Sequence, residues 1–212
     1  MARTLFSSRH SGNLATHVGD DPQSVQAARN ALARSLSTSE IIYMEQTHSD
    51  RICEVTEDHQ SIYDGDALIT SRKGISLGVL VADCIPLLIS SSSHIAAVHV
   101  GRQGLVKEIA LKTFHAMANL GARDFSAVIG PSICAQCYEV SEEMYSDVTA
   151  LIPATATSPE KHCLNLQAGL RAQLEGVGVS VSDLGICTKE SLDFFSYRRD
   201  VETGRQVGVI SQ

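Results

Sequence analysis

Residues 65–104 read GDALITSRKGISLGVLVADCIPLLISSSSHIAAVHVGRQG and hold two apolar runs that predict buried strands. The runs span residues 78–82 and Ile95–Val100, and both are short, contain β-branched residues and are bounded by turn residues. Cys84 follows the first run, and His99 lies near the end of the second. Because α/β proteins commonly place ligands and catalytic groups at strand ends, we expect this thiol and this imidazole to belong to a functional site.

His48, upstream in the segment EQTH, is a third candidate ligand. Two histidines and one cysteine suit Zn²⁺, and three protein ligands leave one coordination position open for water or substrate. His99 lies inside the apolar run AAVHV, where an imidazole is costly to bury unless a metal or a Cys–His pair satisfies it. Pro86, two residues after Cys84, is expected to break what would otherwise be an uninterrupted strand.

The composition is that of an ordinary globular protein, with 43% hydrophobic residues among 212. This length suits one domain spanning residues 1–212. The formal net charge of −7 argues against a general nucleic-acid binder, which usually carries a basic stripe. No apolar run approaches the ~18 residues of a membrane span, and the N-terminal MARTLFSSRHSG lacks the apolar core of a signal peptide. We therefore expect a cytoplasmic protein that binds neither nucleic acid nor membrane.

The six cysteines do not require a disulfide framework in a chain of this length. Cys134 and Cys137 have CxxC spacing, but the sequence offers no second CxxC to complete a four-cysteine zinc site. The pair also does not open a helix in a thioredoxin-like pattern, so neither a zinc nor a redox role is favoured. Cys53, Cys163 and Cys187 are expected to be small buried residues.

Local signals elsewhere alternate between helix and strand and predict a mixed α/β (α+β) domain. Asp21 and Pro22 suit the N-cap and the first position of a helix that continues to residue 36. The longest helix is expected over residues 105–120, with Gly121 as its left-handed stop. Further helices are expected over residues 141–151 and 165–175, a surface connection over 153–160, and strands over 4–9, 41–45, 52–55, 67–70, 125–129, 179–186 and 206–210.

A series of ordered motifs resembles the signature of the YfiH family, the laccase-domain or polyphenol oxidase proteins now regarded as purine nucleoside phosphorylases. The resemblance covers essentially the whole chain, and so many motifs in the right order argue against chance agreement. The motifs are QTH at 46–48, DALIT at 66–70, ADCIP at 82–86, VHVG at 98–101, GPSI at 130–133, CYEV at 137–140, CT at 187–188, FFSYRRD at 194–200 and TGR at 203–205.

The resemblance implies a layered α/β fold similar to the catalytic domain of cytotoxic necrotizing factors. It implies a zinc ion held by His48, Cys84 and His99, which the chemistry of these side chains also favours. The implied reactions are phosphorolysis of adenosine, inosine, guanosine and methylthioadenosine, together with adenosine deamination, so purine nucleoside and phosphate are the expected partners. Copper is the less favoured metal. Phenol oxidation by a multicopper enzyme needs many histidines in His-x-His pairs, whereas this chain has eight histidines and no such pair.

Roles for further residues follow from the resemblance as hypotheses. Cys84 is a catalytic candidate as well as a ligand, with Asp83 or Asp66 as its acid–base partner. Arginine is well suited to bind phosphate, because its planar guanidinium can donate two parallel hydrogen bonds. The adjacent pair at 198–199 could, however, also be a solvated charge cluster. The candidates for contact with substrate are Arg9, Gln46, Arg102, Arg198 and Arg199.

Two other functions remain open. In a Cys–His hydrolase, Cys84 would be the nucleophile and His99 its base, and no metal would be needed. In a non-catalytic member of the family, the same pocket would bind a ligand or a partner protein without turnover. The metal content of the protein distinguishes a Cys–His hydrolase from a zinc enzyme. Nucleoside binding without turnover would favour the non-catalytic family member.

Two departures from the family pattern motivate these alternatives. The N-terminal segment passes almost directly from Arg9 to Asn13-Leu14, so the family's longer loop is shortened here. The usual His-Ala-Gly-Trp-Arg-Gly reads His99-Val100-Gly101-Arg102-Gln103-Gly104, so Trp-Arg is replaced by Arg-Gln. We expect both changes to affect the substrate range.

Overall fold

The computed structural model describes residues 2–36, 38, 40–56, 62–158 and 160–212. The strands are β1 Arg3–Phe6, β2 Glu40–Ile42, β3 Ile52–Glu54, β4 Ala67–Thr70, β5 Ile75–Val81, β6 Ile85–Ser90, β7 Ile95–Val100, β8 Ser126–Ile129, β9 Ser180–Asp183 and β10 Gln206–Ser211. The α-helices are α1 Pro22–Leu36, α2 Arg102–Val106, α3 Ile109–Asn119, α4 Glu142–Leu151, α5 Leu166–Glu175 and α6 Tyr197–Asp200, with short 3-10 turns η1 Arg9–Ser11 and η2 Pro153–Thr155.

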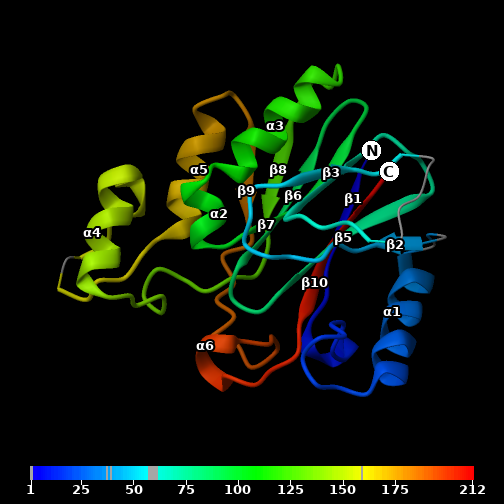
Figure 1. Cartoon of the computed structure of the whole chain (residues 1–212), viewed down its shortest axis with the longest axis horizontal. Coiled ribbons are helices and arrows are strands. Elements are labelled where there is room, and N and C mark those ends of the chain that lie inside the picture. Colours follow the sequence, from blue (N-terminus) through cyan, green and yellow to red (C-terminus); the bar gives the residue numbers. More distant parts are fainter. Residues whose placement is uncertain (1, 37, 39, 57–61, 159) are drawn as a thin grey trace.

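These strands form two sheets that pack face to face (Figure 1). The four-stranded sheet has the order β1-β10-β5-β2, and the six-stranded sheet has the order β3-β4-β7-β6-β8-β9. Leu77 and Val79 of β5 share one apolar core with Leu88 of β6 and Ala97 of β7. Each fully buried leucine of this kind stabilises the fold by about 2 kcal/mol through burial of apolar surface.

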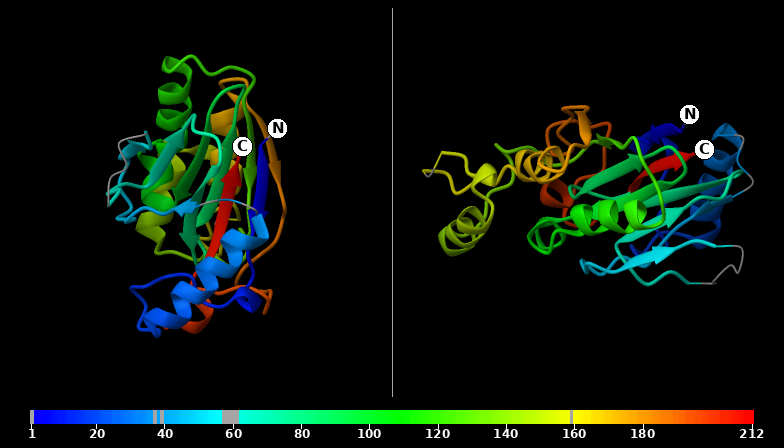
Figure 2. Two further views of the ribbon diagram at one scale, coloured as in Figure 1. Left: turned by 90° about the vertical axis from the view of Figure 1, so that its right-hand side faces the viewer. Right: turned by 90° about the horizontal axis from the view of Figure 1, so that it is seen from above.

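Helices cover the outer face of each sheet and complete a layered α/β fold, as predicted. On one side α1 packs Leu32 into a cluster with Leu80 and Val207 of the four-stranded sheet. On the other side α2, α3 and α5 pack against the six-stranded sheet, where Leu105 and Leu170 belong to its core. The views in Figures 1 and 2 agree that α1 and α4 lie at opposite ends of the long axis. Strands buried on both faces explain the continuous apolar runs of β5 and β7.

The pairing register brings the chemically active strand ends together. β6 runs antiparallel to β7, with Ile85 opposite Val100 and Pro86 opposite His99. Cys84, just before β6, is therefore placed beside the end of β7. The two chain ends also meet, because β1 pairs antiparallel with β10, and N and C lie side by side in both figures.

Several local predictions are confirmed. The helix Pro22–Leu36 begins after Asp21, whose carboxylate accepts the Ser24 N–H at 2.9 Å. Strands Ala67–Thr70 and Ile95–Val100 have the predicted bounds. The helices that follow Ser141 and Asn165 are also present, and both of these side chains act as N-caps.

The expectation that Pro86 breaks a strand is wrong. β6 runs without interruption through Pro86, which is its second residue. The ladder to β8 begins one residue later at Leu87, and the Pro86 carbonyl accepts the Gly130 N–H at 3.1 Å. A proline is tolerated here because its missing N–H lies at the start of the strand, where the loss of one ladder bond costs little.

The expectation of one long helix over residues 105–120 is also wrong. α2 ends at Val106 and α3 begins at Ile109, with Glu108 between them in the left-handed region at φ 59°. α2 lies against the end of β7, so closely that a Cβ at Gly104 would approach the His99 carbonyl oxygen to 3.3 Å. The chain must therefore turn before α3 can run along the sheet. Gly121, at φ 92°, follows α3 as the predicted stop.

Other predicted strands are shorter than expected. β1 ends at Phe6, β2 at Ile42 and β9 at Asp183, and η2 interrupts the predicted connection after α4. Among the helices that the structure describes, none has both the length and the apolar character needed to cross a membrane.

Candidate active site

The three predicted metal ligands meet at one point. His48 comes from the loop after β2, Cys84 from the turn between β5 and β6, and His99 from β7. The Cys84 Sγ lies 3.8 Å from the His48 Nε2, and the two imidazole rings are 4.7 Å apart at 73°. One ligand atom from each residue lies within 4.8 Å of the other two, so the set can hold one metal ion.

Because Gly101 has no side chain, there is room beside it for Cys84 and His48 to approach each other. A Cβ at this position would come within 3.1 Å of the Cys84 Sγ and 3.0 Å of the His48 Cδ2. Any larger residue would therefore push the cysteine and the histidine apart. The glycine is needed for space and not for its backbone angle, since its φ is −82°.

Asp66 positions two of the three ligands at once. Its fully buried carboxylate accepts the backbone N–H groups of Thr47, His48 and Ser49 and so shapes the loop that carries His48. The same carboxylate lies 2.8 Å from the His99 Nδ1. A histidine that donates Nδ1–H to a carboxylate presents Nε2 to a metal, and this pairing is the usual outer support of a histidine ligand.

The electrostatics of the cluster favour a deprotonated thiol. Burial alone would raise the pKa of Cys84, but the charge of His99 and the hydrogen bond with His48 lower it to about 6. Only a thiolate is an effective metal ligand or nucleophile. Together with the space beside Gly101 and the Asp66–His99 pair, this donor set fits Zn²⁺ with one coordination position open.

The cluster lines a pocket of about 830 Å³. Four tyrosines, Tyr43, Tyr63, Tyr138 and Tyr197, contribute to its walls. Aromatic faces of this kind suit a flat heterocycle. The volume of the pocket lies in the range of sites that bind small molecules.

Asp83 lines the pocket, but hydrogen bonds inside the fold occupy its carboxylate. One oxygen accepts the Thr188 hydroxyl and the other accepts the Arg198 N–H, both at 2.6 Å. Its backbone has φ 88°, and its carbonyl accepts the Ile133 N–H. The two predicted acid–base candidates thus differ in position. Asp83 lines the pocket and connects the segments of Thr188 and Arg198, whereas Asp66 is not among the pocket-lining residues and contacts His99 from the side of the core.

Gln46 also lines the pocket, with its amide paired to the backbone of β5. Its Nε2 donates to the Leu80 carbonyl at 2.8 Å, and its Oε1 accepts the Leu80 N–H at 3.0 Å. The side chain therefore continues the sheet beyond β2. This arrangement holds the loop that carries His48.

The adjacent arginines 198 and 199 lie in two different environments. Arg198 lines the pocket, donates to the Glu139 carbonyl and lies over the Tyr138 ring. Arg199 is instead directed into the fold, where it donates to carbonyls of Thr188, Lys189, Ser191 and Phe194 and pairs with Asp200. Only the first of the pair is therefore placed to reach a ligand.

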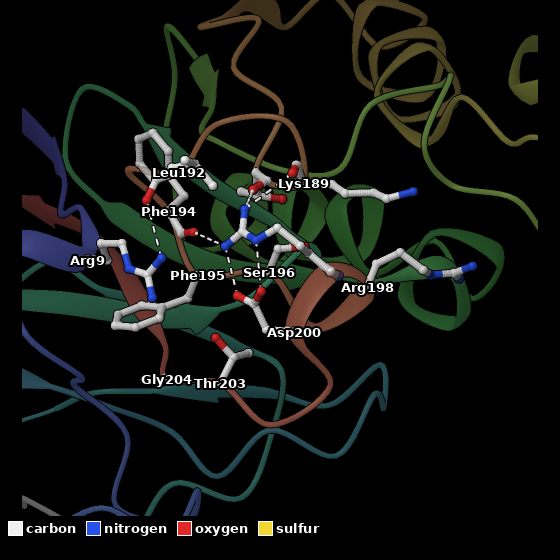
Figure 3. A network of polar contacts seen from close by, with 12 residues as sticks. Arg9, Lys189, Leu192, Phe194, Phe195, Ser196, Arg198, Asp200, Thr203 and Gly204 are labelled. Atoms are coloured by element: carbon white, nitrogen blue, oxygen red, sulfur yellow. Dashed lines mark hydrogen bonds and ion pairs between the residues drawn. The ribbon is translucent and has the colours of Figure 1, made fainter.

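Arg9 and Arg102 are not among the residues that line the pocket. Arg9 lies over the Phe195 ring and donates to the Leu192 carbonyl (Figure 3). Arg102 begins α2 and acts on the pocket through Tyr138. Burial raises the pKa of that phenol, and the charge of Arg102 partly offsets the rise.

Among the basic residues that line the pocket, three were not predicted as site residues: His17, Arg29 and Arg205. Arg29 lies over the Tyr43 ring at 4.2 Å, and Arg205 donates to the carbonyls of residues 203 and 204. Burial, followed by the charges of Arg205 and Arg29, lowers the pKa of His17. The TGR motif was a signal for Arg205, but nothing in the local sequence marks the other two.

Comparison with known proteins identifies relatives over almost the whole chain. Residues 4–212 match the protein family described as multi-copper polyphenol oxidoreductase laccase. A purine nucleoside phosphorylase of Corynebacterium glutamicum is 41% identical and aligns over 98% of this chain and 93% of its own length. An adenosine deaminase from an unidentified prokaryote is 34% identical over 91% of this chain and 84% of its own length.

The fold is shared with solved structures as well. The crystal structure of the hypothetical protein YfiH from Bacillus licheniformis superposes with a TM-score of 0.90 at 27% identity, covering 99% of this chain and 92% of that one. The chain therefore belongs to the laccase-like YfiH family, in which relatives bear the names purine nucleoside phosphorylase and adenosine deaminase.

Proposed function

We propose that this protein is a zinc-dependent purine nucleoside phosphorylase. It would convert adenosine, inosine, guanosine or methylthioadenosine and phosphate into the free base and a ribose 1-phosphate, with adenosine deamination as a second activity. The observation that carries this proposal is the metal-competent cluster of His48, Cys84 and His99 in a pocket that also contains Arg29 and Arg205. The names of the relatives support the same reaction class.

Each part of the pocket has a task in this reaction. His48, Cys84 and His99 would hold the zinc ion, which supplies Lewis-acid stabilisation of developing negative charge. Asp66 keeps the His99 proton on Nδ1, so that the other ring nitrogen stays available as a ligand. The tyrosines of the walls stack on the purine and exclude water from it.

The basic residues favour phosphate as the nucleophile over water. Arg29 and Arg205 line the same pocket as the metal ligands, and a guanidinium can bind phosphate through two parallel hydrogen bonds. Both charges, after burial, contribute to the lowered pKa of His17. A concentration of positive charge in a recessed site attracts an anion, which phosphorolysis needs and deamination does not.

The Cys–His hydrolase has one observation in its favour. The Cys84 thiol lies 3.8 Å from an imidazole nitrogen of His48 and has a lowered pKa, as a nucleophile would. A thiolate bound to zinc is not free to attack, so bound zinc during turnover contradicts this reading.

Product analysis with adenosine tests the proposal directly. Zinc-loaded protein should release adenine and ribose 1-phosphate only when phosphate is present, and inosine in either case would show deamination. Chromatography separates all these products. Tight nucleoside binding without any product would instead identify a non-catalytic member of the family.

The role of Arg205 leads to a kinetic prediction. Arg205→Gln should raise the KM for phosphate about 10- to 100-fold, because a hydrogen bond to a charged group contributes about 1.5–3 kcal/mol. The KM for nucleoside should change much less, and Arg123→Gln, outside the residues that line the pocket, serves as the matched control. An equal loss for both substrates would mean that Arg205 shapes the pocket and does not bind phosphate.

A further inference from the structure

A second group of metal-ligating side chains lies outside the pocket lining. It consists of Cys134 and Cys137 in the loop after β8, and Cys187 and Glu190 in the segment after β9. One potential ligand atom from each residue lies within 4.8 Å of those of the other three. The sequence contains no second CxxC, yet the fold supplies the two missing donors from a segment 50 residues away. Cys163 and Cys187 are buried, as expected, whereas Cys53 is only half-buried.

The distances within this group approach those of a tetrahedral zinc site. The Glu190 Oε1 lies 3.5 Å from the Cys137 Sγ and 3.9 Å from the Cys134 Sγ. Zinc–sulfur and zinc–oxygen bonds of about 2.3 and 2.0 Å give ligand separations of about 3.5–3.8 Å in a tetrahedron. A contraction of less than about 1 Å would therefore bring all four donors onto one ion.

The backbone around the group is arranged as in thiolate sites. The Cys137 N–H donates to the Cys134 carbonyl at 3.0 Å, which closes a turn between the two CxxC cysteines. The Cys134 N–H points to the Cys187 Sγ at 3.4 Å. Hydrogen bonds of this kind stabilise negative charge on sulfur and orient a metal ligand.

The three cysteines of this group are all available as ligands. All six cysteines lie within the described residues, and each is a free thiol. A divalent cation would displace the thiol protons and bind the three sulfur atoms together with the carboxylate.

We propose that Cys134, Cys137, Cys187 and Glu190 bind a second Zn²⁺ ion, separate from the one at His48, Cys84 and His99. Four protein ligands close the coordination sphere, so this ion has a structural role and not a catalytic one. Glu190 is exposed, and the CxxC cysteines are half-buried, so an ion can enter from solvent.

The site would brace one wall of the pocket. Ile133, directly before Cys134, lines the pocket and donates its N–H to the Asp83 carbonyl at 2.9 Å. Thr188, directly after Cys187, donates its hydroxyl to the Asp83 carboxylate at 2.6 Å. One ion would thus join the two segments that hold Asp83 beside Cys84.

Metal analysis of the whole chain tests this proposal. After equilibration with Zn²⁺ and removal of excess ion, the wild-type protein should retain about two zinc ions per chain. The double variant Cys134→Ser/Cys137→Ser should retain about one, and so should His48→Asn, because each change removes a different site. Cys53→Ser, whose thiol contacts only the Asp64 carbonyl among the contacts described, is the matched cysteine control and should retain two. Failure of the phosphorylase assay would leave this count unaffected.

A measurement on the wild-type chain avoids the risk that a variant fails to fold. Alkylation followed by peptide mass mapping should show that Zn²⁺ slows modification of Cys134 and Cys137 at least about 10-fold, while Cys53 reacts at an unchanged rate. Equal labelling with and without Zn²⁺, or one zinc ion in both the wild type and the double variant, would overturn the proposal. So would a chain 2 Da lighter with a Cys134–Cys137 disulfide that survives Zn²⁺, since this result would identify a redox pair.

Discussion

His48→Ala is expected to lose one zinc ion and the phosphorylase activity together. His48 is one of the three proposed ligands, and the two that would remain, Cys84 and His99, would bind zinc far more weakly. Because a metal that stabilises developing charge contributes several kcal/mol, activity should fall at least about 1,000-fold. Elemental analysis and the product assay measure the two effects on the same sample.

Two further variants separate loss of the ligand from loss of the fold. The backbone of His48 has φ 57°, a left-handed angle that asparagine tolerates better than alanine, so His48→Asn removes the imidazole with less strain. Cys84→Ala should reproduce the same double loss from a different element. If either variant kept both its zinc and its activity, the assignment of this centre would be wrong.

Among the variants considered, Asp66→Asn is expected to lower the free energy of unfolding the most. The carboxylate accepts hydrogen bonds from Thr47, from His48, twice from Ser49, and from His99, with no exposure to solvent. An amide would turn its NH₂ toward these donors and leave some of them unsatisfied, at a cost of about 3–5 kcal/mol. Urea denaturation at neutral pH measures this change. Zinc affinity should fall about 10- to 100-fold, because the outer support of His99 is lost.

The same variant should change how stability depends on pH. Burial would raise the pKa of Asp66, but hydrogen bonds with His99 and Ser49 hold it well below the ordinary value of 3.8. A depressed folded-state pKa contributes stability that is complete above the unfolded-state pKa and is lost as pH falls toward the folded-state pKa. The wild type should therefore lose part of its advantage over Asp66→Asn between pH 5 and pH 3. A constant difference in unfolding free energy would show that Asp66 does not titrate in this way. Asp64→Asn, in an exposed pair with Arg51, is the matched control.

Local sequence signals were sufficient for the elements that depend on neighbours in the chain. The run at Ile95–Val100 has the β-branched, two-sided apolar character of a buried strand, and it forms one. Asp21 and Ser141 begin helices because their side chains satisfy N–H groups only three residues away. The three candidate metal ligands could also be named from the sequence, because two imidazoles and a thiol suit Zn²⁺.

Tertiary structure decided whatever depends on groups that are distant in the chain. Pro86 is accepted in β6 because of where the ladder to β8 begins, and Glu108 turns the chain because α2 must fit beside β7. Asp66 becomes the support of His48 and His99 only when β4 and β7 pair. The TGR motif marks Arg205 in the sequence, but only the packing of β10, which Arg205 directly precedes, brings it to the pocket.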